Sequence, residues 1–176
     1  MNTDHSKYVV DIMSANPIVV GPETITWSAE CLAQRKCVHD LLVVRGYRLI
    51  GVVCRCDLLV AGSSARVQDC MRSNPVTIDD QQTVDIAERL MDRCAIGCLP
   101  VVDWSGCLKG VLTLRDLANA GALRDGFRTC AACGSAHGLP SRHEQDEIVF
   151  CARCIEQGRQ PHSTLEETYF TTGGGD

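Results

Sequence analysis

The sequence reads VVDIMSANP over residues 9–17 and VQDCMRSNP over residues 67–75. Both stretches carry a valine, an aspartate and a methionine at matching places and end in Asn-Pro. The match continues at the same spacing, because Leu41-Leu42-Val43-Val44 corresponds to Leu99-Pro100-Val101-Val102. Chance does not keep one spacing for so long, so the chain holds two copies of one unit, over residues 7–62 and 65–122.

The second copy shows most clearly which elements the unit contains. Apolar and polar residues alternate over 76–78, directly after Asn-Pro, and this pattern predicts a short strand. Apolar residues at helical spacing predict an amphipathic helix over 83–94. Residues 98–102 and 108–112 predict two strands joined by a turn, and 114–121 predicts a second helix. Each copy therefore has the order β-α-β-β-α, which indicates a mixed α/β (α+β) fold.

Composition narrows the class of protein. Of the 176 residues, 45% are hydrophobic, which is enough for a packed core, and the net charge of −5 gives no general attraction to nucleic acid. The N-terminus lacks the apolar stretch of a signal peptide, and the apolar runs are far shorter than the about 20 residues that cross a bilayer. We therefore expect a cytoplasmic protein without membrane contact. In such a protein, twelve cysteines indicate metal binding or buried thiols rather than disulfides.

Both copies resemble the CBS domain, the repeat named after cystathionine β-synthase. The resemblance covers roughly two thirds of the chain and rests on three segments: Met71-x-x-Asn74-Pro75-Val76-Thr77, Leu99-Pro100-Val101-Val102-Asp103 and Gly110-Val111-Leu112-Thr113-Leu114-Arg115-Asp116. It implies that the two repeats form one module, a Bateman module, with two clefts between them. In the family such clefts often bind adenosine-containing ligands, and such modules commonly associate as homodimers through their helices.

The chemistry of the second repeat fits this use. Thr113-x-x-Asp116 opens a helix directly after a strand, where unpaired N–H groups and a partial positive charge suit a phosphate. Thr113 offers a hydroxyl, Asp116 can accept from a ribose diol, and Arg115 is a phosphate partner. The same spacing is an ordinary capping box, and the two roles are compatible. With the adenine contacts that the resemblance implies, the expected ligand-binding residues are Val76, Thr77, Ile78, Cys98, Leu99, Pro100, Thr113, Arg115, Asp116 and, in the first repeat, Asp57.

The first repeat departs from this pattern. Cys54 stands where the second repeat has Thr113, and a thiol is a weak donor and a poor cap. The first repeat also lacks a counterpart of Pro100. We therefore expect an adenine nucleotide to bind the second cleft more tightly, with the first cleft empty, weaker or selective for another ligand. Cys54 and Cys56 would face opposite sides of a strand, which argues against one metal ion holding both.

Four cysteines near the C-terminus form the pattern C-x2-C-x17-C-x2-C, namely Cys130, Cys133, Cys151 and Cys154. Each C-x2-C turn directs two thiolates to one centre about 2.3 Å away, and two turns complete a tetrahedron. The alternative is two redox pairs or unrelated thiols, but redox pairs would be expected within a βαβ pattern. We therefore predict a zinc ribbon over 126–160 with a structural Zn²⁺ ion, followed by a flexible tail over 161–176.

These features predict a regulatory protein that senses an adenosine-type nucleotide and docks through its ribbon on a protein regulated in trans. The alternative is a transcription-associated protein whose ribbon contacts nucleic acid or polymerase. Charges over 124–160 cancel and aromatic residues are sparse, so we do not expect direct nucleic-acid binding. The sequence offers no nucleophile–base constellation and no open metal site, so we do not expect an enzyme.

Overall fold

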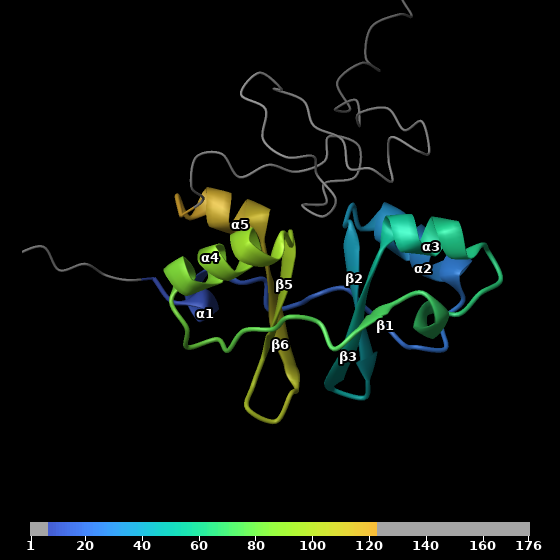
Figure 1. The fold of residues 1–176 in the computed structure, drawn as a ribbon, viewed down its shortest axis with the longest axis horizontal. Coiled ribbons are helices and arrows are strands. Elements are labelled where there is room, and N and C mark those ends of the chain that lie inside the picture. Colours follow the sequence, from blue (N-terminus) through green and yellow to red (C-terminus); the bar gives the residue numbers. More distant parts are fainter. Residues whose placement is uncertain (1–6, 123–176) are drawn as a thin grey trace, which may run out of the picture.

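A computed structural model describes residues 7–122, and these form two halves that lie side by side (Figure 1). The predicted ribbon and tail, with Cys130, Cys133, Cys151 and Cys154, lie outside the described residues. In chain order, the first repeat contains α1 (Val9–Ile12), β1 (Val19–Val20), α2 (Thr26–Arg35), β2 (Asp40–Arg45), β3 (Arg48–Cys54) and α3 (Arg55–Ala61). The second repeat contains a 3-10 turn η1 (Val67–Asp69), β4 (Arg72–Ser73), α4 (Val84–Cys94), β5 (Cys98–Val102), β6 (Leu108–Thr113) and α5 (Leu114–Asn119).

Two small sheets stand in the middle of the molecule, with helices on the outside (Figure 1). One sheet has the order β1-β2-β3-β4, and the other pairs β5 with β6. Strand β1 runs parallel to β2, whereas the β2–β3 and β5–β6 hairpins are antiparallel. The mixed α/β fold expected from the repeats is confirmed.

The strand expected over 76–78 is reduced to a single bridge between Ile78 and Val101. The Ile78 amide donates to the Pro100 carbonyl at 3.1 Å, and the Val102 amide donates to the Ile78 carbonyl at 2.9 Å. The next bond of a parallel ladder would run from residue 100 to the carbonyl of Val76, but proline has no N–H. The first repeat makes this bond, because the Leu42 amide donates to the Ile18 carbonyl at 3.2 Å.

Each repeat completes the core of the other with the segment that precedes its own first strand. Val9 at the start of α1 is fully buried among side chains of the second repeat, including Leu99 and Leu112. Val67 in η1 is fully buried in the core of the first repeat. The chain continues this exchange in β4, which pairs with β3. The two repeats therefore form one module rather than two independent domains.

The backbone also joins the two hairpin tips. The Leu49 amide donates to the Gly106 carbonyl at 3.2 Å, and the Leu108 amide donates to the Tyr47 carbonyl at 2.9 Å. These bonds and the exchanged segments hold the two repeats together, and a cavity lies between the repeats. Among residues 7–122, no helix has both the length and the apolar character needed to cross a membrane.

Candidate ligand-binding site

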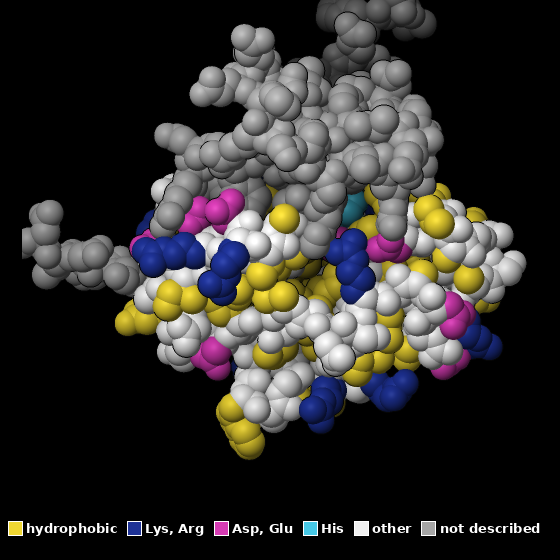
Figure 2. Space-filling model, in the orientation of Figure 1, with side chains coloured by type: hydrophobic (Ala, Val, Ile, Leu, Met, Phe, Trp, Pro, Cys, Tyr) yellow, Lys and Arg dark blue, Asp and Glu magenta, His cyan; other side chains and the backbone are white. Residues whose placement is uncertain are grey.

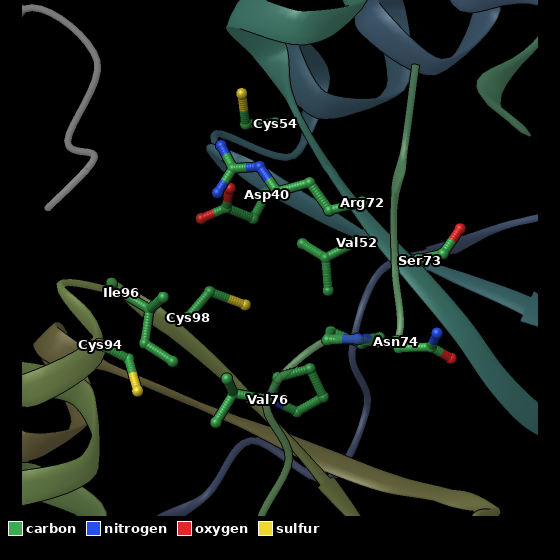
Figure 3. Close-up of a pocket in the computed structure, with 13 residues that line it drawn as sticks. Asp40, Val52, Cys54, Arg72, Ser73, Asn74, Val76, Cys94, Ile96 and Cys98 are labelled. Atoms are coloured by element: carbon green, nitrogen blue, oxygen red, sulfur yellow. The ribbon is translucent and has the colours of Figure 1, made fainter. Parts of the chain in front are cut away.

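A cavity of about 280 Å³ lies between the two repeats (Figure 3). The first repeat contributes Asp40 from β2 and both Val52 and Cys54 from β3. The connecting segment contributes residues 72–76, and the second repeat contributes residues around the start of β5. The volume is close to the lower end of the range of about 300–1,000 Å³ found for small-molecule pockets.

The cavity has a polar end and an apolar end. Asp40 and Arg72 lie together near Cys54, and Val76 and Ile96 lie towards the opposite end (Figure 3). The Arg72 guanidinium is 3.6 Å from the carboxylate of Asp57, and its side chain is 48% exposed. Hydrophobic side chains also gather in the middle of the face shown in Figure 2, between the two halves. A ligand with one flat apolar part and one polar part matches this polarity.

Three of the ten residues predicted to bind ligand line this cavity, namely Val76, Cys98 and Pro100. Ile78 and Leu99 instead face the core of the second repeat, with 6% and 0% of their surface exposed. The remaining five residues do not line the cavity: Thr77, Thr113, Arg115, Asp116 and Asp57. The expected constellation is thus brought together only in part.

Thr113 and Asp116 form a complete capping box at the start of α5. The Thr113 hydroxyl and amide donate to Asp116 Oδ2 at 2.7 and 2.8 Å, and the Asp116 amide donates back to Thr113 Oγ1 at 3.4 Å. These bonds stabilise the first turn of the helix by satisfying N–H groups that lack helical partners. Arg115 lies on the exposed side of the same turn.

The prediction that Cys54 is a poor cap is wrong, because its side chain caps the start of α3. Its Sγ accepts a hydrogen bond from the Asp57 amide at 3.3 Å and lies 2.9 Å from Asp57 Oδ2, where the thiol donates to the carboxylate. The cysteine thus repeats the arrangement of Thr113 and Asp116 with sulfur in place of oxygen. The hydrogen bond with Cys56, burial and the neighbouring Asp57 all raise the pKa of Cys54, so the thiol is neutral at physiological pH.

The argument that Cys54 and Cys56 face opposite sides of a strand is also wrong, because the strand does not reach Cys56. Strand β3 ends at Cys54 and α3 begins at Arg55, so Cys56 lies in the first helical turn. The change from strand to helix turns both thiols to the same side, and both lie close to His39.

Cys98 also lines the cavity. Burial raises its pKa well above the ordinary value, and the nearby carboxylates of Asp40 and Asp116 raise it further. Cys98 therefore presents a neutral, weakly polar surface to a ligand.

Sequence reasoning missed Asp40 and Arg72, the two charged residues of the cavity. Arg72 directly follows the methionine of the repeated motif, but the first copy has Ser14 at that place. Comparison between the copies therefore gave no reason to select it. Asp40 follows His39 at the start of β2, and only its position in the sheet reveals that it faces the second repeat.

The CBS domain family model matches residues 9–64 and 67–122, more than half of the chain. The chain therefore belongs to the CBS domain family. A relative is the inosine-5'-monophosphate dehydrogenase of Nitrosopumilus maritimus (strain SCM1), which is 33% identical over 109 residues, or 61% of this chain and 23% of the relative. This chain spans less than a quarter of the length of the curated dehydrogenases that it matches.

Solved CBS pairs share the fold. The structure of CBSX2 in complex with AMP superposes with a TM-score of 0.61 at 31% identity, covering 65% of this chain and 95% of that one. CBSX2 is a CBS-pair protein from Arabidopsis thaliana. The CBS domain pair of protein MJ0100, solved with 5'-methylthioadenosine and S-adenosyl-L-methionine, has a TM-score of 0.61 at 23% identity and covers 65% of this chain and 99% of its own.

Proposed function

We propose that this protein is a regulatory module that binds an adenosine-type nucleotide in the cavity between its repeats. The observation that carries the proposal is the polarity of the cavity, with Arg72 and Asp40 at one end and Val76 and Ile96 at the other. The AMP complex of CBSX2 supports the choice of ligand class, since that chain is 31% identical and almost fully covered. The proposal describes a binding module and assigns no reaction to it.

The cavity suggests how a nucleotide would lie. The purine would pack between Val76, Ile96 and Pro100, because a flat ring gains most from apolar contacts. The Val76 carbonyl does not receive the strand bond that Ile18 receives, so it can accept from the amino group of adenine. The phosphate would pair with Arg72, whose guanidinium matches phosphate oxygens in a bidentate manner.

Asp116 does not line the cavity, and its contact with the ribose remains a prediction. Both hydrogen bonds that Asp116 accepts from Thr113 use Oδ2, so Oδ1 can accept from a ribose hydroxyl. The second cleft is then favoured over the first, because at the first helix start Asp57 is engaged with the Cys54 thiol and with Arg72.

Calorimetric titration with AMP, ADP and ATP tests the proposal. Arg72→Ala should weaken binding by roughly tenfold or more, because a hydrogen bond to a charged group contributes about 1.5–3 kcal/mol. Arg115→Ala is the matched control, since Arg115 carries the same charge but does not line the cavity. No binding by the parent protein, or equal losses in the two variants, would refute the assignment.

We also propose that residues 126–160 form a zinc ribbon that docks on a protein regulated in trans. The support is the paired spacing of Cys130, Cys133, Cys151 and Cys154, which is that of a four-thiolate structural site. A Cys130→Ser/Cys151→Ser double variant should lose one zinc ion per chain by metal analysis. Unchanged zinc content in this variant would contradict the ribbon.

A further inference from the structure

Three metal-binding side chains meet at the start of α3, on the wall of the first repeat. His39 directly precedes β2, and Cys54 is the last residue of β3. The two strands bring them together, because Asp40 and Cys54 are register partners in the hairpin. Cys56 follows in the first turn of α3, and the Arg55 amide donates to the His39 carbonyl at 2.9 Å, which holds the helix start against His39. The donor atoms of the three side chains all lie within 4.8 Å of one another.

The histidine is oriented for coordination by a neighbouring carboxylate. His39 Nδ1 lies 3.1 Å from Asp40 Oδ1, so in the neutral imidazole an Nδ1–H group donates to Asp40 and Nε2 carries the lone pair. His39 Nε2 faces Cys56 Sγ at 4.0 Å. A carboxylate that fixes the tautomer of a histidine in this way is the usual outer partner of a histidine that binds zinc.

We propose that His39, Cys54 and Cys56 form a binding site for a zinc-class divalent transition metal ion, separate from the four cysteines of the C-terminal part. Two thiolates and one imidazole select zinc over magnesium or calcium, which take oxygen ligands. In a tetrahedral site with a Zn–S distance of about 2.3 Å, two sulfurs lie about 3.8 Å apart, and the donor atoms here lie within 4.8 Å of one another. The observed separations therefore need only small side-chain movements to close around an ion.

The charges around the cluster favour a cation. Asp57 Oδ2 is 2.9 Å from Cys54 Sγ, and Asp40 Oδ1 is 3.1 Å from His39 Nδ1. Of the nearby arginines, Arg55 is held by Glu30 at 2.6 Å, and the Arg72 guanidinium is 3.6 Å from Asp57 on the exposed side. Cys54 and Cys56 are buried, with 6% and 3% of each residue exposed, so two thiolates here would need a positive charge beside them. Three protein ligands leave a fourth position for water or for the Asp57 carboxylate.

The third donor distinguishes this cluster from a simple dithiol. Two neighbouring thiols alone could equally form a disulfide. A disulfide needs no third ligand, whereas here the imidazole nitrogen of His39 that faces the sulfurs is the kind of ligand that a metal ion takes. Because Cys54 also lines the cavity, the metal ion would stand in the cavity wall.

Native mass spectrometry of the full-length protein after equilibration with Zn²⁺ tests the proposal. The informative variant is Cys54→Thr, which installs the residue that the second repeat uses at the same place, so the helix cap is kept while the thiolate is lost. This variant should carry about one zinc ion fewer per chain than the parent. Cys98→Ala, which removes a thiol from the same cavity but not from the cluster, should leave the zinc content unchanged.

Cobalt substitution provides a second measurement that does not depend on counting ions. The parent loaded with Co²⁺ should show sulfur-to-cobalt charge transfer, and part of this signal should disappear in Cys54→Thr and in Cys56→Ala. In His39→Gln the charge-transfer signal should remain while the affinity for the ion falls by at least tenfold, as expected when a nitrogen ligand or its outer partner is lost. Equal zinc content and equal cobalt spectra in the parent and Cys54→Thr would overturn the site. That result would leave nucleotide binding untouched, since the calorimetric test is independent.

Discussion

Met71 lies so close to Gly51 that a Cβ atom at residue 51 would lie 2.7 Å from the Sδ atom of Met71. Met13 has the same relation to Gly110 in the second repeat, at 2.8 Å. Each glycine thus makes room for the methionine that the other repeat inserts into the core. The glycine and the methionine that recur in both copies are explained by this contact between repeats.

Alanine at these glycines should destabilise the module by about 1–3 kcal/mol, because an extra methyl group has no space. Gly110→Ala should be the more severe change, since its new Cβ would lie 2.8 Å from the Ser14 carbonyl oxygen, whereas a Cβ at residue 51 would lie 3.0 Å from the Arg72 carbonyl oxygen. A backbone oxygen cannot move aside alone. Urea denaturation measures both effects. Adding Met71→Ala should recover part of the Gly51→Ala loss, whereas Met13→Ala should recover less of the Gly110→Ala loss. Equal recovery would contradict this account.

Pro100→Leu should lengthen the strand pairing of the second repeat. Leucine is the residue that the first repeat has at this place, and its N–H would donate to the Val76 carbonyl as Leu42 donates to Ile18. Hydrogen exchange should show a newly protected amide at residue 100. The same change should lower the affinity for adenine nucleotides, measured by calorimetry, if the Val76 carbonyl accepts a hydrogen bond from the base. An amide at residue 100 that exchanges as fast as those of the loops would disprove the pairing.

Cys98 should react slowly with iodoacetamide although it lines a cavity. Its pKa is raised by burial and by the carboxylates of Asp40 and Asp116, so little thiolate is present near pH 7, and thiolate is the reactive form. Because the pKa is raised, the rate should still be climbing at alkaline pH, well above the ordinary titration range of a thiol. Peptide mapping against the exposed Cys37 measures the difference. Modification of Cys98 as rapidly as Cys37 at pH 7 would contradict the raised pKa.

We predict a homodimer through the helices, which leave large apolar side chains exposed. Trp27 in α2 is 63% exposed, Val60 in α3 is 62% exposed and Ile86 in α4 is 45% exposed. Trp27→Asp should therefore shift the protein to a smaller species in light scattering, because a charge at an apolar interface is costly. Trp104→Asp serves as the control, since Trp104 is 95% exposed in the turn between β5 and β6. A monomeric parent, or the same shift in both variants, would argue against the interface.

The repeat, its element order and the pairing of its hairpins could be predicted because matched spacing and short-range patterns determine them. The exchange of the leading segments could not, since nothing in VVDIMSANP says whose core receives Val9. The strand predicted over 76–78 is reduced to one bridge, because the residue that would donate to the Val76 carbonyl is Pro100. Sequence alone does not reveal which residues pair in the ladder. The cluster of Cys54 and Cys56 was misjudged because one residue decides where β3 ends and α3 begins. Arg72 and Asp40 were missed because their meeting depends on the arrangement of both repeats.

The mutual insertion of leading segments has a consequence for how such a protein could arise. A single repeat on its own would lack the methionine and valine that fill its core, and a second copy of itself is the natural supplier. An ancestral half-length chain would therefore fold as a swapped pair, in which each copy lends its first residues to the other. Fusing two copies turns that encounter into an intramolecular event at high effective concentration. Once fused, the halves are free to diverge, and Cys54 opposite Thr113 is a trace of that divergence.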